Sequence, residues 1–156
     1  MELGIAIITC SSTRTLAEDQ AGATLADRIH DRGWNVASHE VVPDNRMTIS
    51  EAIITCADAG ADIVLTCGGS GLSLADVTPE ATADVCDRNV PGIAEAMRAA
   101  SLQITGRAML SRAVCMQRGT TLVVNLPGST KAASECFDAT CDQFEHAVQM
   151  MAGGGH

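Results

Sequence analysis

Four residues of this chain, Gly68-Gly69-Ser70-Gly71, have the composition of an anion-binding loop. They follow the apolar run 62–66 (DIVLT). Glycine has no Cβ, so its backbone N–H group can turn toward an anion without a steric clash. The loop is therefore predicted to hold a phosphate group, although glycine-rich turns also occur as ordinary tight connections.

The loop matches none of the common glycine motifs. The P-loop pattern G-x-x-x-x-G-K-[ST] is missing from the sequence. Leu74 stands where a dinucleotide fingerprint needs its third glycine, and Leu72 stands where a nucleophile elbow needs its last one. Ser70 is thus a poor candidate for a covalent nucleophile, and we expect the loop to bind rather than to react.

Two acidic residues accompany the predicted phosphate loop. Asp76 comes shortly after it, and Asp44 follows Pro43 at the end of another apolar run. Mg²⁺ in proteins is held by one or two carboxylates together with phosphate oxygens. Either acid alone also suits an ordinary turn or helix cap. The pair favours a catalytic metal site with Asp44 and Asp76 as ligands.

Lys131 is the only lysine of the chain, and it follows Pro127-Gly128-Ser129 in the first turn of the predicted last helix. A cation at that position opposes the helix dipole, and a bound anion removes the conflict. We therefore predict a contact with a phosphate group, the alternative being an exposed lysine. Arg112 and Arg118 are weaker candidates, because arginines near a hairpin usually face solvent.

The elements that must position these residues alternate between strand and helix. The apolar and β-branched runs predict strands at 4–9, 34–42, 62–66, 112–116 and 121–126, the last two as a hairpin. The helical patterns lie at 19–32, 48–60, 78–88, 93–104 and, as one final helix, along the apolar face from Ala133 to Met151. Thr48 with Glu51 has the spacing of a capping box, and Thr78 before Pro79 suits an N-cap.

This alternation predicts an α/β fold, a three-layer α/β/α arrangement with a mostly parallel sheet. Ligands of such sheets bind outside the carboxyl ends of the strands. Ser11-Ser12, Asp44, the glycine loop and the segment 125–129 all follow predicted strands. We expect one domain, residues 1–152, and a flexible tail, residues 153–156.

Composition narrows the class of partner. The net charge is −9, and the chain holds one Trp, two Phe and no Tyr, so neither a basic face nor stacking platforms for nucleic acid are expected. No stretch approaches 18 consecutive apolar residues, so no membrane span is expected. The seven cysteines include no C-x-x-C pair and suit buried thiols of a cytoplasmic protein.

Several segments together resemble the molybdopterin-binding family of the MogA and MoaB proteins, which also includes the G domains of gephyrin and the plant Cnx proteins. The segments that carry the resemblance are Cys67 to Leu72 (CGGSGL), Asp76 to Thr82 (DVTPEAT), Pro91-Gly92, Leu110 to Val114 (LSRAV) and Val124 to Ser129 (VNLPGS). The resemblance extends from Gly4 to the last helix.

The resemblance implies a homotrimeric enzyme that uses Mg²⁺ and ATP to adenylylate molybdopterin with release of pyrophosphate, ahead of molybdenum insertion by a partner protein. It makes Asp44 and Asp76 the essential acids. The other site residues that it implies are the nucleotide loop Gly68-Gly69-Ser70-Gly71, Ser111 for the pterin phosphate, the closing loop Pro127-Gly128-Ser129, and Asp19 with Gly22 as an acid-x-x-Gly element near the nucleotide. The alternative is a carrier or trimeric scaffold without catalysis, which would not need both acids.

The sequence departs from the family pattern at four positions. Cys67 and Ser70 replace the two threonines of a T-G-G-T-G loop, Met116 stands where a glycine is usual, and Ser12 stands where an Asp or Asn is common. Ser70 keeps a hydroxyl, whereas Cys67 does not. We expect Met116 either to narrow the pocket or to repack beside it.

Overall fold

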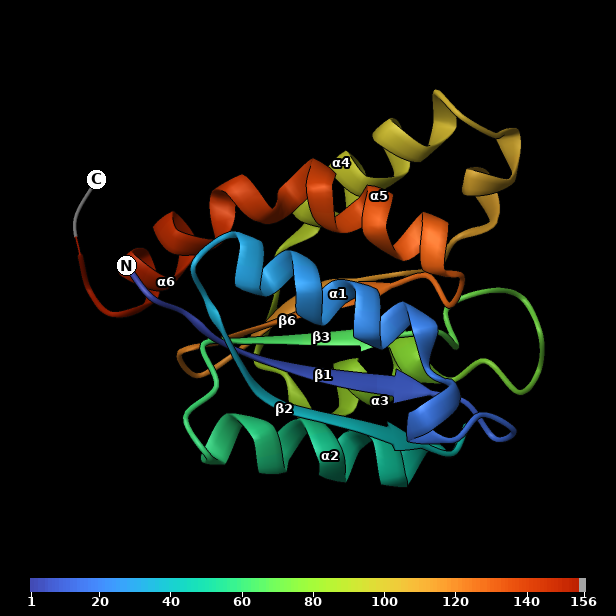
Figure 1. The fold of residues 1–156 in the computed structure, drawn as a ribbon, viewed down its shortest axis with the longest axis horizontal. Helices are drawn as coiled ribbons and strands as arrows, with labels where there is room; N and C mark the ends of the chain where they lie inside the picture. The colour runs from blue at the N-terminus through green and yellow to red at the C-terminus, as the bar shows by residue number, and fades with distance from the viewer. Residues whose placement is uncertain (155–156) are drawn as a thin grey trace.

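A computed structural model describes residues 1–154 of the protein, which form a sheet of six strands between two layers of helices (Figure 1). The strands are β1 (Gly4–Cys10), β2 (Asn35–Val42), β3 (Ile63–Cys67), β4 (Arg88–Asn89), β5 (Cys115–Arg118) and β6 (Thr121–Leu126). The helices are α1 (Gln20–Asp31), α2 (Arg46–Asp58), α3 (Thr78–Val85), α4 (Pro91–Leu102), α5 (Thr130–Thr140) and α6 (Phe144–Met151). Three short 3₁₀ helices lie at η1 (Leu16–Glu18), η2 (Gly106–Leu110) and η3 (Cys141–Gln143).

The strand order is β2-β1-β3-β6-β5-β4, which confirms the predicted mostly parallel α/β sheet. β2, β1, β3 and β6 run parallel, β5 pairs antiparallel with β6, and β4 pairs antiparallel with β5. The carboxyl ends of the four parallel strands therefore meet at one edge. The chain leaves β1 for β2 on one side and reaches β3 on the other, so the topological switch point lies between β1 and β3.

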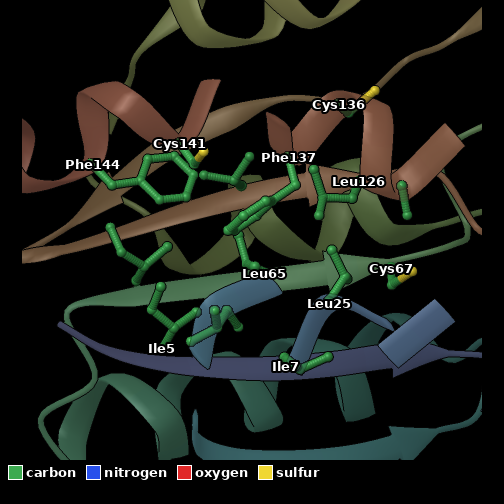
Figure 2. Close-up of a cluster of buried hydrophobic side chains, with 14 of the residues drawn as sticks. Ile5, Ile7, Leu25, Leu65, Cys67, Leu126, Cys136, Phe137, Cys141 and Phe144 are labelled. Atoms are coloured by element: carbon green, nitrogen blue, oxygen red, sulfur yellow. The ribbon is translucent and has the colours of Figure 1, made fainter. Parts of the chain in front are cut away.

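Alternate residues of the central strands face the two helical layers. Ile5 and Ile7 of β1 pack into the core under α1, α4, α5 and α6 (Figure 2), whereas Ala6 and Ile8 pack into the core over α2 and α3. Burial on both faces explains why the strands read as continuous apolar runs. None of the helices in residues 1–154 is long and apolar enough to cross a membrane.

The three aromatic residues of the chain meet in one cluster. Trp34 lies with its ring centroid 6.5 Å from that of Phe137 and 6.1 Å from that of Phe144, and the Trp34 indole N–H donates to Glu145 at 2.8 Å. This cluster fixes α5 and α6 on the sheet. The predicted burial of the cysteines is also confirmed, with Cys86 alone only half-buried.

Two predicted helix caps are wrong. Asn45, not Thr48, caps α2, because its side chain accepts the Thr48 N–H at 3.0 Å and the helix begins at Arg46. Thr78 is not the N-cap of α3 either. It is the first helical residue, and its hydroxyl donates to the carbonyl of Gly68 at 2.9 Å, a tertiary contact that local capping rules do not see.

Other boundaries also differ from the prediction. The helix that begins at Thr78 ends at Val85 rather than near residue 88, because the next residues pair as β4 with β5. The hairpin is confirmed, but its first strand is Cys115–Arg118 and not 112–116. The last helix is broken at η3, where the Thr140 hydroxyl bonds back to the Cys136 carbonyl, a contact that bends helices.

The expected flexible tail lies only partly in the described residues. Gly153 and Gly154 donate to the carbonyls of Met150 (3.0 Å) and Gln149 (2.8 Å) and so cap α6. Gly155 and His156 lie outside the described residues.

Candidate functional site

The glycine loop turns sharply at the carboxyl end of β3. Gly68 and Gly69 have φ values of +98° and +71°, a region that favours glycine. A Cβ on Gly68 would lie 2.8 Å from the Cys10 carbonyl oxygen, and a Cβ on Gly69 would overlap the Thr78 hydroxyl. Both positions therefore need glycine for space as well as for conformation.

The second loop, 127–129, lies directly against the glycine loop. A Cβ on Gly128 would lie 3.3 Å from the Cα of Gly68, and the Gly68 N–H donates to the Leu126 carbonyl at 2.9 Å. Ser129 is the N-cap of α5, and its side chain accepts the Ala132 N–H at 3.2 Å. The predicted nucleotide loop and the predicted closing loop thus form one surface at the carboxyl edge of the sheet.

Asp44 lies at the end of β2 beside this surface. Its Oδ2 accepts from the Ser12 backbone N–H at 3.2 Å and from the Ser12 hydroxyl at 3.3 Å. Its Oδ1 is buried and has no hydrogen-bond partner within the described residues. A Cβ on Gly69 would lie 3.4 Å from that oxygen, which places Oδ1 next to the glycine loop. An unpaired buried carboxylate oxygen is costly unless a ligand completes it.

Asp76 lies at the other end of the glycine loop. Its Oδ2 accepts the Gly71 N–H at 3.1 Å, and a Cβ on Gly71 would lie 2.9 Å from the same oxygen. No ion pair within 4 Å involves Asp76 in residues 1–154. The two acids therefore flank the loop, Asp44 at Gly69 and Asp76 at Gly71.

A cavity of about 480 Å³ opens beside the two loops. Among the predicted site residues, those that line it are Gly68, Gly69, Ser70, Gly71, Asp76, Ser111, Pro127, Gly128 and Ser129. Its far wall comes from α4, η2 and α5, through residues such as Met97, Arg98, Arg107 and Glu135. Sequence reasoning missed this wall, because nothing in the local pattern of α4 and η2 distinguishes them from other amphipathic segments.

Several predicted site residues do not line the cavity, and Asp19 is one of them. It is 2% exposed, and both carboxylate oxygens are occupied. Oδ2 accepts from the Thr9 hydroxyl (2.5 Å) and from His39 Nε2 (2.7 Å), and Oδ1 accepts the Gly22 N–H (3.0 Å). A contact between Asp19 and a nucleotide stays a prediction without support from this geometry.

The same contacts set the ionisation of Asp19. Burial alone would raise the pKa of this carboxyl group, but the hydrogen bonds from Thr9, His39 and Gly22 outweigh that effect and lower the pKa below its ordinary value. The acid-x-x-Gly spacing also has a packing reason. A Cβ on Gly22 would overlap both Asp19 Oδ2 and His39 Nε2. Asp19 is thus a charged N-cap of α1 that joins β1, β2 and the helix.

Lys131 and Asp44 also lie outside the cavity lining. The Lys131 side chain is 81% exposed, and its Nζ lies 3.9 Å from Glu135 one helical turn away. Its predicted contact with a phosphate group stays a prediction. Asp44 differs from Lys131 because its Oδ1 lies next to the lining residue Gly69.

The departures from the family pattern have separate explanations. The thiol of Cys67 is buried, and it donates to the Pro127 carbonyl at 3.1 Å. Burial raises the pKa of this thiol to about 12, so it stays protonated and ties β3 to the closing loop. Met116 lies on β5 opposite Val123 and does not line the cavity, so it does not narrow the pocket.

Arg112 is more than a solvent-exposed hairpin arginine. The segment 111–114 precedes β5, and the Arg112 guanidinium donates to Glu80 at 2.6 Å and to two carbonyls of the glycine-loop region. This bond to Glu80 is the main cause that raises the pKa of Arg112, and it also lowers the pKa of Glu80. Contacts between segments so far apart have no local signal in the sequence.

Comparison with known proteins identifies the family of the chain. A family model described as "Probable molybdopterin binding domain" matches residues 6–146. The chain belongs to this family. The relatives that it is similar to include the molybdopterin adenylyltransferase of Helicobacter pylori, which is 32% identical over 98% of this chain and 89% of that protein.

Solved structures of the same family share the fold. The molybdopterin biosynthesis enzyme MoaB from Thermus thermophilus is 38% identical, with a TM-score of 0.89 and 97% of each chain covered. The molybdopterin biosynthesis Mog protein from Mycobacterium ulcerans is 36% identical, with a TM-score of 0.88 over 96% of this chain and 99% of that chain. The three-layer fold expected from the sequence is thereby confirmed.

The side chains present fit a magnesium ion that is shared with a substrate. Residues 1–154 contain no group of three or more His, Cys, Asp or Glu side chains that could hold a metal alone. Asp44 and Asp76 offer two carboxylates, one with an unpaired oxygen, beside a glycine loop. Mg²⁺ usually binds in this way, with few protein carboxylates and several phosphate or water oxygens.

Proposed function

We propose that this protein transfers the adenylyl group of ATP to molybdopterin in a Mg²⁺-dependent reaction. The family membership supports the substrate class, since a relative of similar length is a molybdopterin adenylyltransferase. The single observation that carries the proposal is the buried, unpaired Oδ1 of Asp44 next to the glycine loop. A protein that only carried molybdopterin would not need both Asp44 and Asp76 beside the glycine loop.

The loop offers donors as well as acceptors. Within the described residues, the backbone N–H groups of Gly69 and Ser70 donate to no protein acceptor. The N-terminus of α5 begins next to Ser129, which lines the same cavity, and a helix N-terminus favours an anion. These groups support a role in holding the phosphates of ATP or molybdopterin, despite the net charge of −9.

The reaction needs positioning more than covalent chemistry from the protein. An oxygen of the molybdopterin phosphate forms a bond to the α-phosphorus of ATP, and the bond from that phosphorus to the oxygen bridging to the β-phosphate breaks, releasing pyrophosphate. We assign the glycine loop and the 127–129 loop to phosphate orientation, Ser111 to the pterin phosphate, and Asp44 and Asp76 to the metal. Magnesium bound with ATP supplies neutralising charge for the phosphates.

The direct test is product formation by the purified protein. Molybdopterin, ATP and Mg²⁺ together should give adenylyl-molybdopterin and pyrophosphate in equal amounts, and omission of any one of the three should abolish both. Binding of molybdopterin without any pyrophosphate would instead support the carrier or scaffold function.

We further propose a homotrimer in the cytoplasm that passes its product to a molybdenum-insertion protein. Exposed apolar side chains near the end of α4 and in η2 support an assembly surface, namely Leu102, Ile104, Met109 and Leu110. Light scattering at micromolar concentration should give three times the monomer mass of 16.2 kDa. A monomer mass would contradict the trimer.

A further inference from the structure

The segment 70–76 carries Asp76 but has few contacts of its own with the rest of the protein. Leu72 is 62% exposed and Leu74 is fully exposed. Inside the segment, the Gly71 N–H donates to Asp76 Oδ2, and the Asp76 N–H donates to the Ser73 carbonyl at 2.9 Å. These bonds give the segment its shape, but they do not fix its position relative to the sheet.

Arg112 fixes the segment at three points. Its backbone N–H donates to the Ser70 carbonyl at 2.8 Å, its Nε to the Gly71 carbonyl at 2.7 Å, and its Nη2 to the Asp76 carbonyl at 2.9 Å. In the described part of the chain, segment 70–76 accepts no other hydrogen bond from any residue before 69 or after 80. A guanidinium is a rigid, planar set of donors, so its two bonds, together with the bond from the backbone N–H, hold both ends of the segment in one geometry.

Glu80 forms an ion pair with the third guanidinium nitrogen of Arg112. Its Oε2 accepts from Nη1 at 2.6 Å, across the first turn of α3. Arg112 bonds to the carbonyl of Asp76, and no ion pair within 4 Å joins it to the Asp76 carboxylate. A guanidinium paired with that carboxylate would compete with a cation for the same oxygens.

We propose that Arg112 is a positioning residue that holds Asp76 beside the glycine loop, and that Glu80 neutralises it so that the Asp76 carboxylate stays available to Mg²⁺. The inference rests on the metal role given to Asp76 in the proposed function. It goes further because it assigns a role to Arg112 and Glu80, which affect the metal site only through Asp76.

The protein contains a matched control ion pair. Arg46 donates to both oxygens of Asp84 at 2.6 and 2.7 Å, and Asp84 lies on α3 four residues after Glu80. This pair is as short as the pair of Glu80 with Arg112, but in the described residues neither member makes a hydrogen bond or an ion pair with 70–76. Loss of the Asp84 charge therefore reports the effect of breaking an ion pair on α3 without disturbing the loop.

The first comparison is Glu80→Gln against Asp84→Asn. The introduced glutamine can still accept from Arg112, so the main change is the loss of a charge. We expect the Mg²⁺ concentration for half-maximal rate to rise about fivefold to tenfold in Glu80→Gln, with kcat at saturating Mg²⁺ within about twofold of the wild type. Asp84→Asn should keep both values of the wild type.

Arg112→Lys tests the positioning itself. Lysine keeps the charge but cannot make three directed bonds. We expect kcat to fall about tenfold or more, without rescue by excess Mg²⁺. Thermal melts of all variants check folding, and Glu80→Gln still tests the proposal if Arg112→Lys does not fold.

Calorimetry of ATP binding with and without Mg²⁺ reads the metal site independently of turnover. The gain in ATP affinity from Mg²⁺ should be smaller in Glu80→Gln than in Asp84→Asn. If the wild type binds Mg-ATP but forms no product, that result refutes only the proposed reaction. The calorimetric comparison of Glu80→Gln with Asp84→Asn still decides the role of Glu80 and Arg112 in that case. Equal Mg²⁺ dependence in Glu80→Gln and Asp84→Asn, with wild-type turnover in a folded Arg112→Lys, would show that the ion pair serves folding alone.

Discussion

Asp19 and Asp44 both lie at the carboxyl edge of the sheet, yet their surroundings differ. Asp19 is buried with both oxygens occupied, by Thr9 and His39 on one side and Gly22 on the other. Asp44 has one oxygen bonded to Ser12 and one buried oxygen without a partner in the described residues. The first arrangement is complete without a ligand, and the second is not.

This difference teaches that hydrogen-bond completeness separates the two kinds of acid better than position does. A saturated carboxylate stabilises the fold, and filling its surroundings with a ligand would break existing bonds. An unsaturated carboxylate costs stability and is retained where a ligand completes it. Substitution of one acid of each kind should therefore separate an effect on rate from an effect on stability.

The largest effect is expected for Asp76→Asn. Asparagine keeps an acceptor for the Gly71 N–H but removes the charge that a hard cation prefers. We expect kcat to fall about a hundredfold or more, which is roughly 2.7 kcal/mol of transition-state stabilisation. Excess Mg²⁺ should restore part of the rate. The measurement is adenylyl-molybdopterin formed per minute. A thermal melt of the variant that matches the melt of the wild type shows that the variant is folded.

Asp19→Asn should act on stability instead. The side-chain amide of asparagine has an NH₂ group in place of one carboxylate oxygen. That group is a donor, and it would face donors of the protein that now bond to the Asp19 oxygens. We expect a loss of about 2–3 kcal/mol in the free energy of unfolding, since hydrogen bonds to a charged group are among the stronger ones. Urea unfolding followed by the fluorescence of Trp34, the single tryptophan, measures it. Unchanged stability would show that the network around Asp19 is not structural.

The lowered pKa of Asp19 gives this contribution a pH dependence. A carboxyl group whose pKa is lower in the folded state stabilises the fold above its unfolded pKa, about 4, and loses that contribution as the pH falls through the folded value. The stability difference between wild type and Asp19→Asn should therefore be largest near neutral pH and shrink below about pH 4. A difference that grows on acidification would contradict the assigned direction.

The smallest effect is expected for Lys131→Ala. The side chain is 81% exposed and 3.9 Å from Glu135, and such pairs contribute less than about 1 kcal/mol. Calorimetry should show affinities for ATP and molybdopterin close to those of the wild type. A loss of about tenfold or more for either ligand would return Lys131 to the phosphate role suggested by its place in the sequence.

The fold class was predictable because burial on both faces leaves a clear pattern in β1, β3 and β6. Elements were misplaced where tertiary contacts override local chemistry. Thr78 has the right type for an N-cap, but its hydroxyl bonds to Gly68 instead. The start of α2 was misplaced for a local reason, because Asn45 caps the helix three residues before the predicted cap Thr48.

The candidate site was predictable where chemistry lies within a few residues, as in the glycine loop and Asp76. Asp19 and Gly22 were recognised as a pair, but their spacing has a packing reason that appears only when His39 comes from another strand. Arg112 was predicted only as a weaker candidate, because its partners Gly71 and Glu80 lie 41 and 32 residues away in the chain.

The central claim is that Asp44, which has an unpaired oxygen, serves the reaction, and that Asp19, whose oxygens are both hydrogen-bonded, serves folding. The most direct test is the rate of pyrophosphate release by Asp44→Asn and by Asp19→Asn, measured at a temperature where melts show both variants folded. We predict a loss of about a hundredfold or more for Asp44→Asn and a rate within about threefold of the wild type for Asp19→Asn. Equal losses in the two variants, or a wild-type rate in Asp44→Asn, would contradict the claim.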